Sequence, residues 1–301
     1  MAFRNLIISS EAELTLKNKQ LRIQTENITD TVPIEDIDTV LVENRRTVLS
    51  AALLGALGNS GAALFICDEF HMPCAVLLPY LQHSRQHLIT KKQLSMTAPA
   101  KKQLWRQIVT SKIENQAICL SLCGNSRVSY ELLAISKNVK SGDSGNAEGH
   151  AAARYFAAVF GDSFFRGNEA DLRNGWLNYG YAILRGCVAR TLTSYGFFPT
   201  FGIHHHSQLN QFNLADDFLE PFRPLVDLFV AKNATAESNL TPAVKKSLVN
   251  LVNYNIAVAG KKYALSYAIE QCVKSFSSML AGKRKDLLMP KLIELEQHKY
   301  E

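Results

Sequence analysis

Apolar and polar residues alternate over short segments in the first 80 residues, a pattern typical of β-strands. Residues 13–23 predict a β-hairpin with its turn at Lys17-Asn18-Lys19, and residues 50–57 predict one short helix. Further strands are expected at residues 3–9, 32–34, 38–42, 64–67 and 75–78. This part of the chain therefore predicts a β-rich domain, and its compact sheet suits pairing with a second copy of the chain.

After residue 100 the apolar spacing changes to one residue in every three or four, as on one face of an α-helix. Residues 176–195 give a long amphipathic segment, and Gly196 follows it, as glycine often follows a helix. Three more helices are expected at residues 241–251, 261–281 and 286–299. The predicted fold class is α+β: a β-rich N-terminal domain at residues 1–85, a linker at 86–100, and an all-α C-terminal domain at 101–301.

Residues 48–67 carry no charge over 20 positions, which invites comparison with a membrane span. Gly58, Asn59, Ser60 and Gly61 interrupt the middle, so the stretch predicts a buried helix, a turn and a buried strand. The N-terminal apolar run is too short for a signal peptide, and acidic residues follow it. The six cysteines include no CxxC pair, which favours free thiols in a reducing cytosol. We expect a cytoplasmic protein with no membrane partner.

The net charge is +6, and it is unevenly distributed. Residues 1–90 carry 7 basic and 10 acidic side chains, whereas residues 91–301 carry 26 and 17. No acidic residue lies between Glu69 and Glu114. The basic residues of that interval are Arg85, Lys91, Lys92, Lys101, Lys102, Arg106 and Lys112. A polyanion such as DNA is the natural partner of this charge, and the alternative is a solvated basic face.

Residues 202–227 combine histidines with acidic residues at helical spacing. The histidines are His204, His205 and His206. Asp217 and Glu220 follow three residues apart, so on a helix both carboxylates would share one face. Asp216 adds a third negative charge, which is costly without a cation or a basic partner. One imidazole with two carboxylates is a donor set for a divalent cation; the alternative is a histidine-rich surface loop before a solvated helix.

Glu148 begins a helix of small residues directly after a glycine- and serine-rich loop. A lone glutamate in the first turn of a helix is by default a favourable partner of the helix dipole. The alternative is a ligand that the helix end delivers to a buried centre. Spacing alone favours the first hypothesis.

Together these segments resemble the CRISPR-associated adaptation integrase family, which inserts new spacers into CRISPR arrays. The most specific parts are the Glu148 helix (AEGHAAARYF), the Gly202-x-x-His205 element, and the acidic segment DFLEPFRP that begins at Asp217. The segment Lys112-Ile-Glu-Asn115-Gln116 also resembles the helix that opens the second domain of the family. The runs QFNLA and EPFRPLVD are most similar to members from type II systems.

The resemblance implies an N-terminal β domain, a C-terminal helical catalytic domain, and homodimers joined through the β domains. It implies Mg²⁺ or Mn²⁺ at the site. The implied metal ligands, which are also the implied catalytic residues, are Glu148, His205 and Glu220. Asp217, one turn earlier, is the alternative acidic ligand, and His204 and His206 are chemical alternatives to His205. Arg223 would orient the carboxylates or contact a phosphate.

The implied reaction is attack by a DNA 3′-hydroxyl on a phosphodiester at the edge of a CRISPR repeat. With water as the nucleophile, the same centre would be a nuclease. The implied partners are double-stranded DNA (protospacer and repeat), a second copy of the chain, and a small dimeric companion adaptation protein. The effector nuclease of type II systems is a further candidate. Two alternatives are a general metal-dependent nuclease that acts on branched repair intermediates, and a non-catalytic DNA-binding scaffold.

Overall fold

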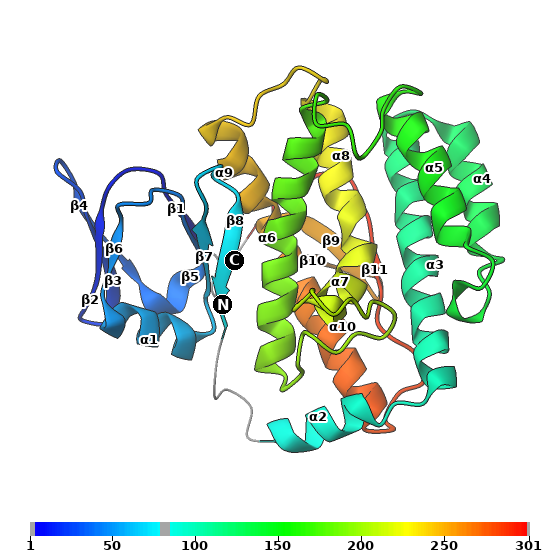
Figure 1. The fold of residues 1–301 in the computed structure, drawn as a ribbon, viewed down its shortest axis with the longest axis horizontal. Helices are drawn as coiled ribbons and strands as arrows, with labels where there is room; N and C mark the ends of the chain where they lie inside the picture. Colours follow the sequence, from blue (N-terminus) through cyan, green and yellow to red (C-terminus); the bar gives the residue numbers. More distant parts are fainter. Residues whose placement is uncertain (1–3, 79–84, 300–301) are drawn as a thin grey trace. The chain divides into compact units, whose positions relative to one another are not determined.

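The computed structural model describes residues 4–78 and 85–299, and the contacts divide the chain into two compact units. Unit 1 comprises residues 1–84 with 300–301, and unit 2 comprises residues 85–299. Unit 1 consists of strands and the helix α1, whereas unit 2 is mostly helical (Figure 1). The predicted α+β class, with strands first and helices second, is confirmed. Residue 3, the predicted start of the first strand, lies outside the described residues.

In the residues described, unit 1 holds two four-stranded sheets. The first has the order β1-β5-β7-β8, with parallel pairs β1–β5 and β5–β7 and an antiparallel pair β7–β8. The second has the order β4-β3-β2-β6. The elements of unit 1 are β1 (Arg4–Ile8), β2 (Glu13–Lys17), β3 (Gln20–Gln24), β4 (Thr29–Pro33), η1 (Ile34–Asp36), β5 (Ile37–Val42), β6 (Val48–Leu49), α1 (Ala51–Ser60), β7 (Ala63–Cys67) and β8 (Pro73–Leu77).

The predicted hairpin is present as β2 and β3. Asn18 and Lys19 between them have φ values of 50° and 59°, the left-handed backbone of a two-residue hairpin turn. The uncharged stretch forms β6, α1 and β7, and Gly61 (φ 80°) ends the helix, so the predicted helix, turn and strand are confirmed. No helix within the described ranges is long and apolar enough to cross a membrane. All six cysteines lie in those ranges, and none forms a disulfide.

Helix α3 is central to unit 2, where it contacts α4, α5, α8 and the turn η3. The Thr97 side chain caps its start by accepting the N–H of Ala100. Figure 1 shows α8 between α3 and the long helix α6. The helices of unit 2 are α2 (Gln86–Leu94), α3 (Ala98–Leu122), α4 (Ser126–Ser136), η2 (Ser141–Asp143), α5 (Ala147–Phe160), α6 (Arg173–Ser194), α7 (Asn213–Leu219), η3 (Glu220–Phe222), α8 (Arg223–Asn233), α9 (Pro242–Asn250), η4 (Leu251–Asn253) and α10 (Leu265–Leu280).

Residues 86–100, expected to be a linker, contain α2 and the first residues of α3. The buried side chain of Gln93 explains why α2 is ordered. Its Nε2 donates to the carbonyl oxygens of Phe198 at 2.9 Å and Phe201 at 2.8 Å, and its Oε1 accepts the N–H of Phe198. These bonds hold α2 against the loop between α6 and α7.

Unit 2 also contains a small antiparallel sheet of order β10-β9-β11, with β9 (Asn255–Val258), β10 (Lys261–Ala264) and β11 (Pro290–Lys291). The prediction that the C-terminal domain is all-α is therefore wrong for this part. The helix predicted at residues 261–281 is wrong for its first four residues, and the helix predicted at 286–299 is wrong throughout. Ala259 and Gly260 both have positive φ values and form the turn of the β9–β10 hairpin. Pro290 lacks an N–H and does not suit a helix interior.

Candidate active site

The loop between α6 and α7 folds over the carboxylate of Asp217, which is fully buried on α7. That carboxylate accepts the backbone N–H of Ile203 at 2.5 Å, and those of His204 and His205 at 3.1 Å each. Its Oδ1 also lies 2.7 Å from Nδ1 of His205. Because a carboxylate can only accept, Nδ1 donates, and in the neutral imidazole Nε2 of His205 keeps its lone pair.

Gly202 allows this loop to turn tightly. A Cβ at this position would lie 2.1 Å from the carbonyl oxygen of His205 and 2.9 Å from Oδ2 of Asp217. Both distances are shorter than real Cβ contacts, so a side chain would displace the loop. The Gly-x-x-His spacing thus has a physical cause: the glycine lets the backbone reach Asp217, and the histidine three residues later meets the same carboxylate.

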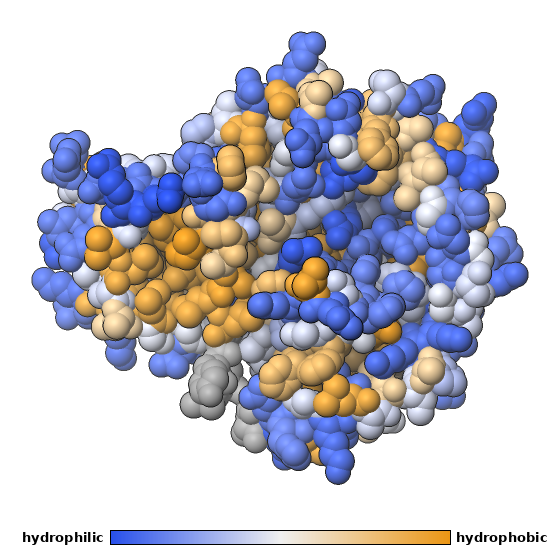
Figure 2. All heavy atoms as spheres, viewed as in Figure 1, coloured by the Kyte–Doolittle hydropathy of each residue, from blue (hydrophilic) through white to orange (hydrophobic). Residues whose placement is uncertain are grey.

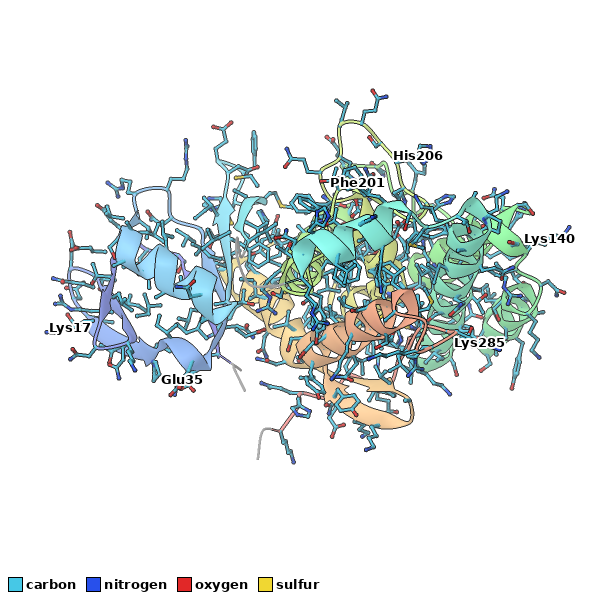
Figure 3. All side chains as sticks on the ribbon, turned by 90° about the horizontal axis from the view of Figure 1, so that it is seen from below. Lys17, Glu35, Lys140, Phe201, His206 and Lys285 are labelled. Atoms are coloured by element: carbon cyan, nitrogen blue, oxygen red, sulfur yellow. The ribbon has the colours of Figure 1, made fainter. Side chains whose placement is uncertain are left out.

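The two neighbouring histidines have other partners. The ring of His204 stacks on the buried Trp105, with 4.1 Å between centroids and 3° between planes. Nδ1 of the exposed His206 lies 2.7 Å from the carbonyl oxygen of His204. Figure 3 shows His206 with Phe201 on this loop, next to α2. Burial lowers the pKa of His204, whereas the hydrogen bond to Asp217 raises the pKa of His205. His205 is therefore the histidine that its surroundings orient towards the acidic side chains.

Glu148 and Glu220 converge on a single ammonium group, that of Lys112 from α3. Nζ lies 2.6 Å from Oε1 of Glu148 and 2.5 Å from Oε2 of Glu220. Burial would raise the pKa of Glu220, but Lys112 and Arg223 lower it to about 2. Burial likewise opposes the charge of Lys112, but the carboxylates of Glu220 and Glu148 raise its pKa. Glu220 and Lys112 are therefore both charged at neutral pH.

Two other side chains fix the elements that carry these carboxylates. Asp143 accepts the N–H groups of Ala147 at 2.8 Å and Glu148 at 3.0 Å, so the first turn of α5 is capped by Asp143. The carboxylate of Glu148 pairs with Lys112. The sequence favoured a simpler role for Glu148, as a partner of the helix dipole, and did not predict this ion pair. Asn115, on α3, donates to the carbonyl oxygen of Pro221 at 2.8 Å and so joins α3 to η3.

Arg223 connects Glu220 to a buried polar cluster. Its Nε donates to Oε1 of Glu220 at 2.9 Å, and its guanidinium lies 4.4 Å from the ring centroid of Tyr181. The hydroxyls of Tyr181 and Tyr155 both donate to the carboxylate of Asp227, which is 1% exposed. Arg223 is therefore held on both sides, by a carboxylate and by an aromatic face.

Asp227 gives this cluster a measurable pH dependence. Burial raises its pKa from 3.8 to about 6, although Tyr181 and Tyr155 donate to it. A raised carboxyl pKa favours the folded state below pH 3.8, and this advantage is lost as the pH rises through about 6, a change of about 3 kcal/mol. Asparagine mimics the protonated carboxyl, so between pH 4 and pH 7 the unfolding free energy of Asp227→Asn should fall by about 2 kcal/mol less than that of wild type. Urea unfolding across this range measures it, with the exposed Asp162→Asn as control. Equal slopes in Asp227→Asn and wild type would contradict the assignment.

Across residues 4–78 and 85–299, no three His, Cys, Asp or Glu side chains stand close enough to hold a metal as they are. The position between Glu148 and Glu220 is taken by the Lys112 ammonium, itself a cation. Oε2 of Glu220 is buried and has no hydrogen-bond partner. It faces Nζ of Lys112 as an ion pair. Two carboxylates and the free Nε2 of His205 are donors that Mg²⁺ and Mn²⁺ accept. These donor types fit such an ion, but among the residues described the three side chains form no cluster and Lys112 lies between the two carboxylates.

The basic residues predicted to bind DNA divide into two groups. Six are exposed or half-buried at the start of α2, on α2 and on α3: Arg85, Lys91, Lys92, Lys101, Lys102 and Arg106. Lys112 differs, because only 12% of its side chain is exposed and it lies between the two carboxylates. Sequence patterns identified the Lys112 segment but not its partners, since Glu148 is 36 residues away along the chain. No sequence motif marks Trp105 or Asp143 as part of the site.

Comparison with known proteins places the chain in a family. The family model described as "CRISPR associated protein Cas1" matches residues 6–242. The CRISPR-associated endonuclease Cas1 of Neisseria meningitidis serogroup C (strain 8013) is 44% identical over 305 residues, which cover 100% of both chains.

Two solved structures share the fold. A casposase bound to integration product has a TM-score of 0.77 and 20% identity, with 94% of this chain and 92% of that chain covered. A Cas6-RT-Cas1–Cas2 complex has a TM-score of 0.71 and 17% identity, with 93% of this chain and 35% of that chain covered. Since the family model spans most of the sequence and the Neisseria relative is similar over its full length, the chain belongs to the Cas1 family.

Proposed function

We propose that this chain is an integrase of CRISPR adaptation, which joins the 3′-hydroxyl of protospacer DNA to a phosphodiester at the edge of a repeat. The observation that carries the proposal is the convergence of Glu148 and Glu220, from two different elements, on one positive charge. The Neisseria relative is named an endonuclease, and the casposase is described with an integration product. Both descriptions support phosphodiester chemistry on DNA.

Glu148, His205 and Glu220 are the proposed ligands of Mg²⁺ or Mn²⁺. Glu220 is preferred to Asp217, because both oxygens of Asp217 already accept hydrogen bonds from residues 203–205. When bound, the metal lowers the pKa of the attacking hydroxyl and neutralises charge on the phosphate. Arg223 keeps Glu220 ionised and oriented. Asp217 accepts from Nδ1 of His205 and so leaves the Nε2 lone pair of the neutral ring available to a metal ion.

Double-stranded DNA, both protospacer and repeat, is the proposed substrate, and the exposed basic residues of α2 and α3 are proposed to contact its phosphates. Lysine and arginine contacts to phosphates supply affinity that does not depend on base sequence. The exposed residues Lys283, Arg284 and Lys285, after α10, add further positive charge to unit 2, and Figure 3 labels Lys285.

Unit 1 is proposed to form a homodimer with a second copy. Figure 2 shows apolar side chains gathered over this unit, and Leu54, Ile66 and Leu77 are partly buried apolar residues beside its core. Removing such a surface from water favours association. A small dimeric companion protein is proposed as well, since one of the similar solved structures is described as a complex of Cas6-RT-Cas1 with Cas2. The type II effector nuclease is a further candidate partner, and the cytoplasm is the proposed location.

A strand-transfer assay tests the proposal. A protospacer duplex with labelled 5′ ends is incubated with the protein, its companion and a supercoiled plasmid that carries the repeat. We expect the label to appear in the plasmid with Mg²⁺ or Mn²⁺, and not with EDTA or with 3′-dideoxy ends. Cleavage of branched DNA without joining would instead indicate a general nuclease. If there is neither joining nor cleavage, and no metal-dependent rise in melting temperature, the protein is a DNA-binding scaffold.

A further inference from the structure

The carboxylates of Glu148 and Glu220 already have two cationic partners, which leaves no net negative charge for a metal ion. Lys112 bridges Glu148 and Glu220, and Arg223 makes a second ion pair with Glu220. Two carboxylates are thus already balanced by two cationic side chains. A divalent ion added among them would leave two uncompensated positive charges in a site where Glu220 and Lys112 are largely buried. Withdrawal of one cationic side chain when the ion enters would halve this excess.

Lys112 is the side chain that can leave. Arg223 is held by Glu220 on one side and by the Tyr181 ring on the other, and its planar group is suited to stay there. Lys112 makes its two contacts through one ammonium at the end of a flexible four-carbon chain. Its partner Glu148 is 25% exposed, so the site opens to solvent on that side.

We propose that Lys112 is a displaceable internal cation: it holds Glu148 and Glu220 together in the metal-free protein and withdraws when a divalent ion binds. The inference rests on the proposed function, which assigns the ion to these carboxylates. Before binding, the ammonium screens two carboxylates that would otherwise repel each other. The same ammonium competes with the incoming ion, so the apparent metal affinity is the difference between the two interactions.

The test compares Mn²⁺ binding by wild type, Lys112→Met and Lys101→Met, measured by calorimetry and by thermal melting. Methionine keeps the apolar stem and removes the charge. Lys101 lies on the same helix about 16 Å away and serves as a matched control. We expect metal-free Lys112→Met to melt below wild type and to bind Mn²⁺ about tenfold more tightly, since a neighbouring like charge has been removed. Its melting temperature should also rise more on adding Mn²⁺. Lys101→Met should match wild type in its metal-free melting temperature, in its Mn²⁺ affinity and in the rise of its melting temperature with Mn²⁺.

The outcomes separate this inference from the proposed function. If wild type integrates DNA and binds Mn²⁺, but Lys112→Met binds it equally or less tightly, only the inference fails. If wild type neither binds Mn²⁺ nor integrates DNA, the proposed function fails and the inference with it. Should Lys112→Met not fold, crystal structures of wild type with and without Mn²⁺ decide. Nζ more than about 4 Å from both carboxylates in the Mn²⁺ form supports displacement, and Nζ still bridging them overturns it.

Discussion

Replacing Glu220 by glutamine is expected to reduce strand transfer by more than about 100-fold, which exceeds the effect typical of residues that only support a metal ligand. Glutamine keeps the size of the side chain but removes the negative charge that faces Lys112 and Arg223. A neutral amide is also a poorer ligand for Mg²⁺ or Mn²⁺ than a carboxylate. The loss should therefore appear in the chemical step, because the basic residues of α2 and α3 are untouched.

Glu131→Gln is the matched control for this variant. Glu131 lies on α4 and also faces two cationic side chains, Arg127 and Arg154, but 46% of its side chain is exposed. Both proteins are assayed for label transfer to the plasmid and for DNA binding at fixed salt. We expect Glu131→Gln to resemble wild type in label transfer and in DNA binding. Glu220→Gln should bind DNA as wild type does but should not transfer the label. A Glu220→Gln protein that still joins DNA at the wild-type rate would remove Glu220 from the set of ligands.

The two acids of the central motif show where sequence periodicity succeeds and where it stops. A spacing of three predicts that Asp217 and Glu220 share a helix face, and both side chains are buried. The helix, however, ends at Leu219, and Glu220 begins a 3-10 turn that contains Pro221. Asp217 thereby reaches the loop of His205, whereas Glu220 reaches Lys112. Periodicity does not encode such a change of partner, because it depends on distant elements.

The elements themselves were predicted where local pattern decides them. The hairpin of β2 and β3 and the long helix α6 follow from alternation and helical spacing. The segment 286–299 has leucines at helical intervals, yet it contains no helix, because its polar backbone groups bond to other elements. The carbonyl oxygen of Pro290 accepts from Ser111 and Asn115 on α3, and the N–H of Leu292 donates to Asn115. Tertiary contacts of this kind override the local apolar pattern.

The second large effect is expected from Asp217→Asn, although the proposed function does not give Asp217 contact with the metal. The carboxylate accepts at both oxygens, from the N–H groups of Ile203, His204 and His205 and from the His205 ring. An asparagine accepts at only one end, and its NH₂ group would face either two backbone donors or the His205 side. At least one buried donor is then left unsatisfied, so we expect a loss of about 3 kcal/mol in unfolding free energy.

The same substitution should weaken Mn²⁺ binding about 10- to 100-fold, because the imidazole loses the partner that fixes its tautomer. Nitrogen-15 NMR of labelled histidine provides a readout that loss of stability alone would not change. His205 should change from the Nδ1–H tautomer to a mixture of the Nδ1–H and Nε2–H tautomers. Asp216→Asn is the matched control. Asp216 is the adjacent buried acid, and it bonds to Arg185 and Asn210 rather than to the imidazole. It should lose stability while the His205 tautomer stays unchanged. If Asp217→Asn keeps both the wild-type tautomer and the wild-type Mn²⁺ affinity, then Asp217 does not orient His205, and its buried charge serves only to fold the loop.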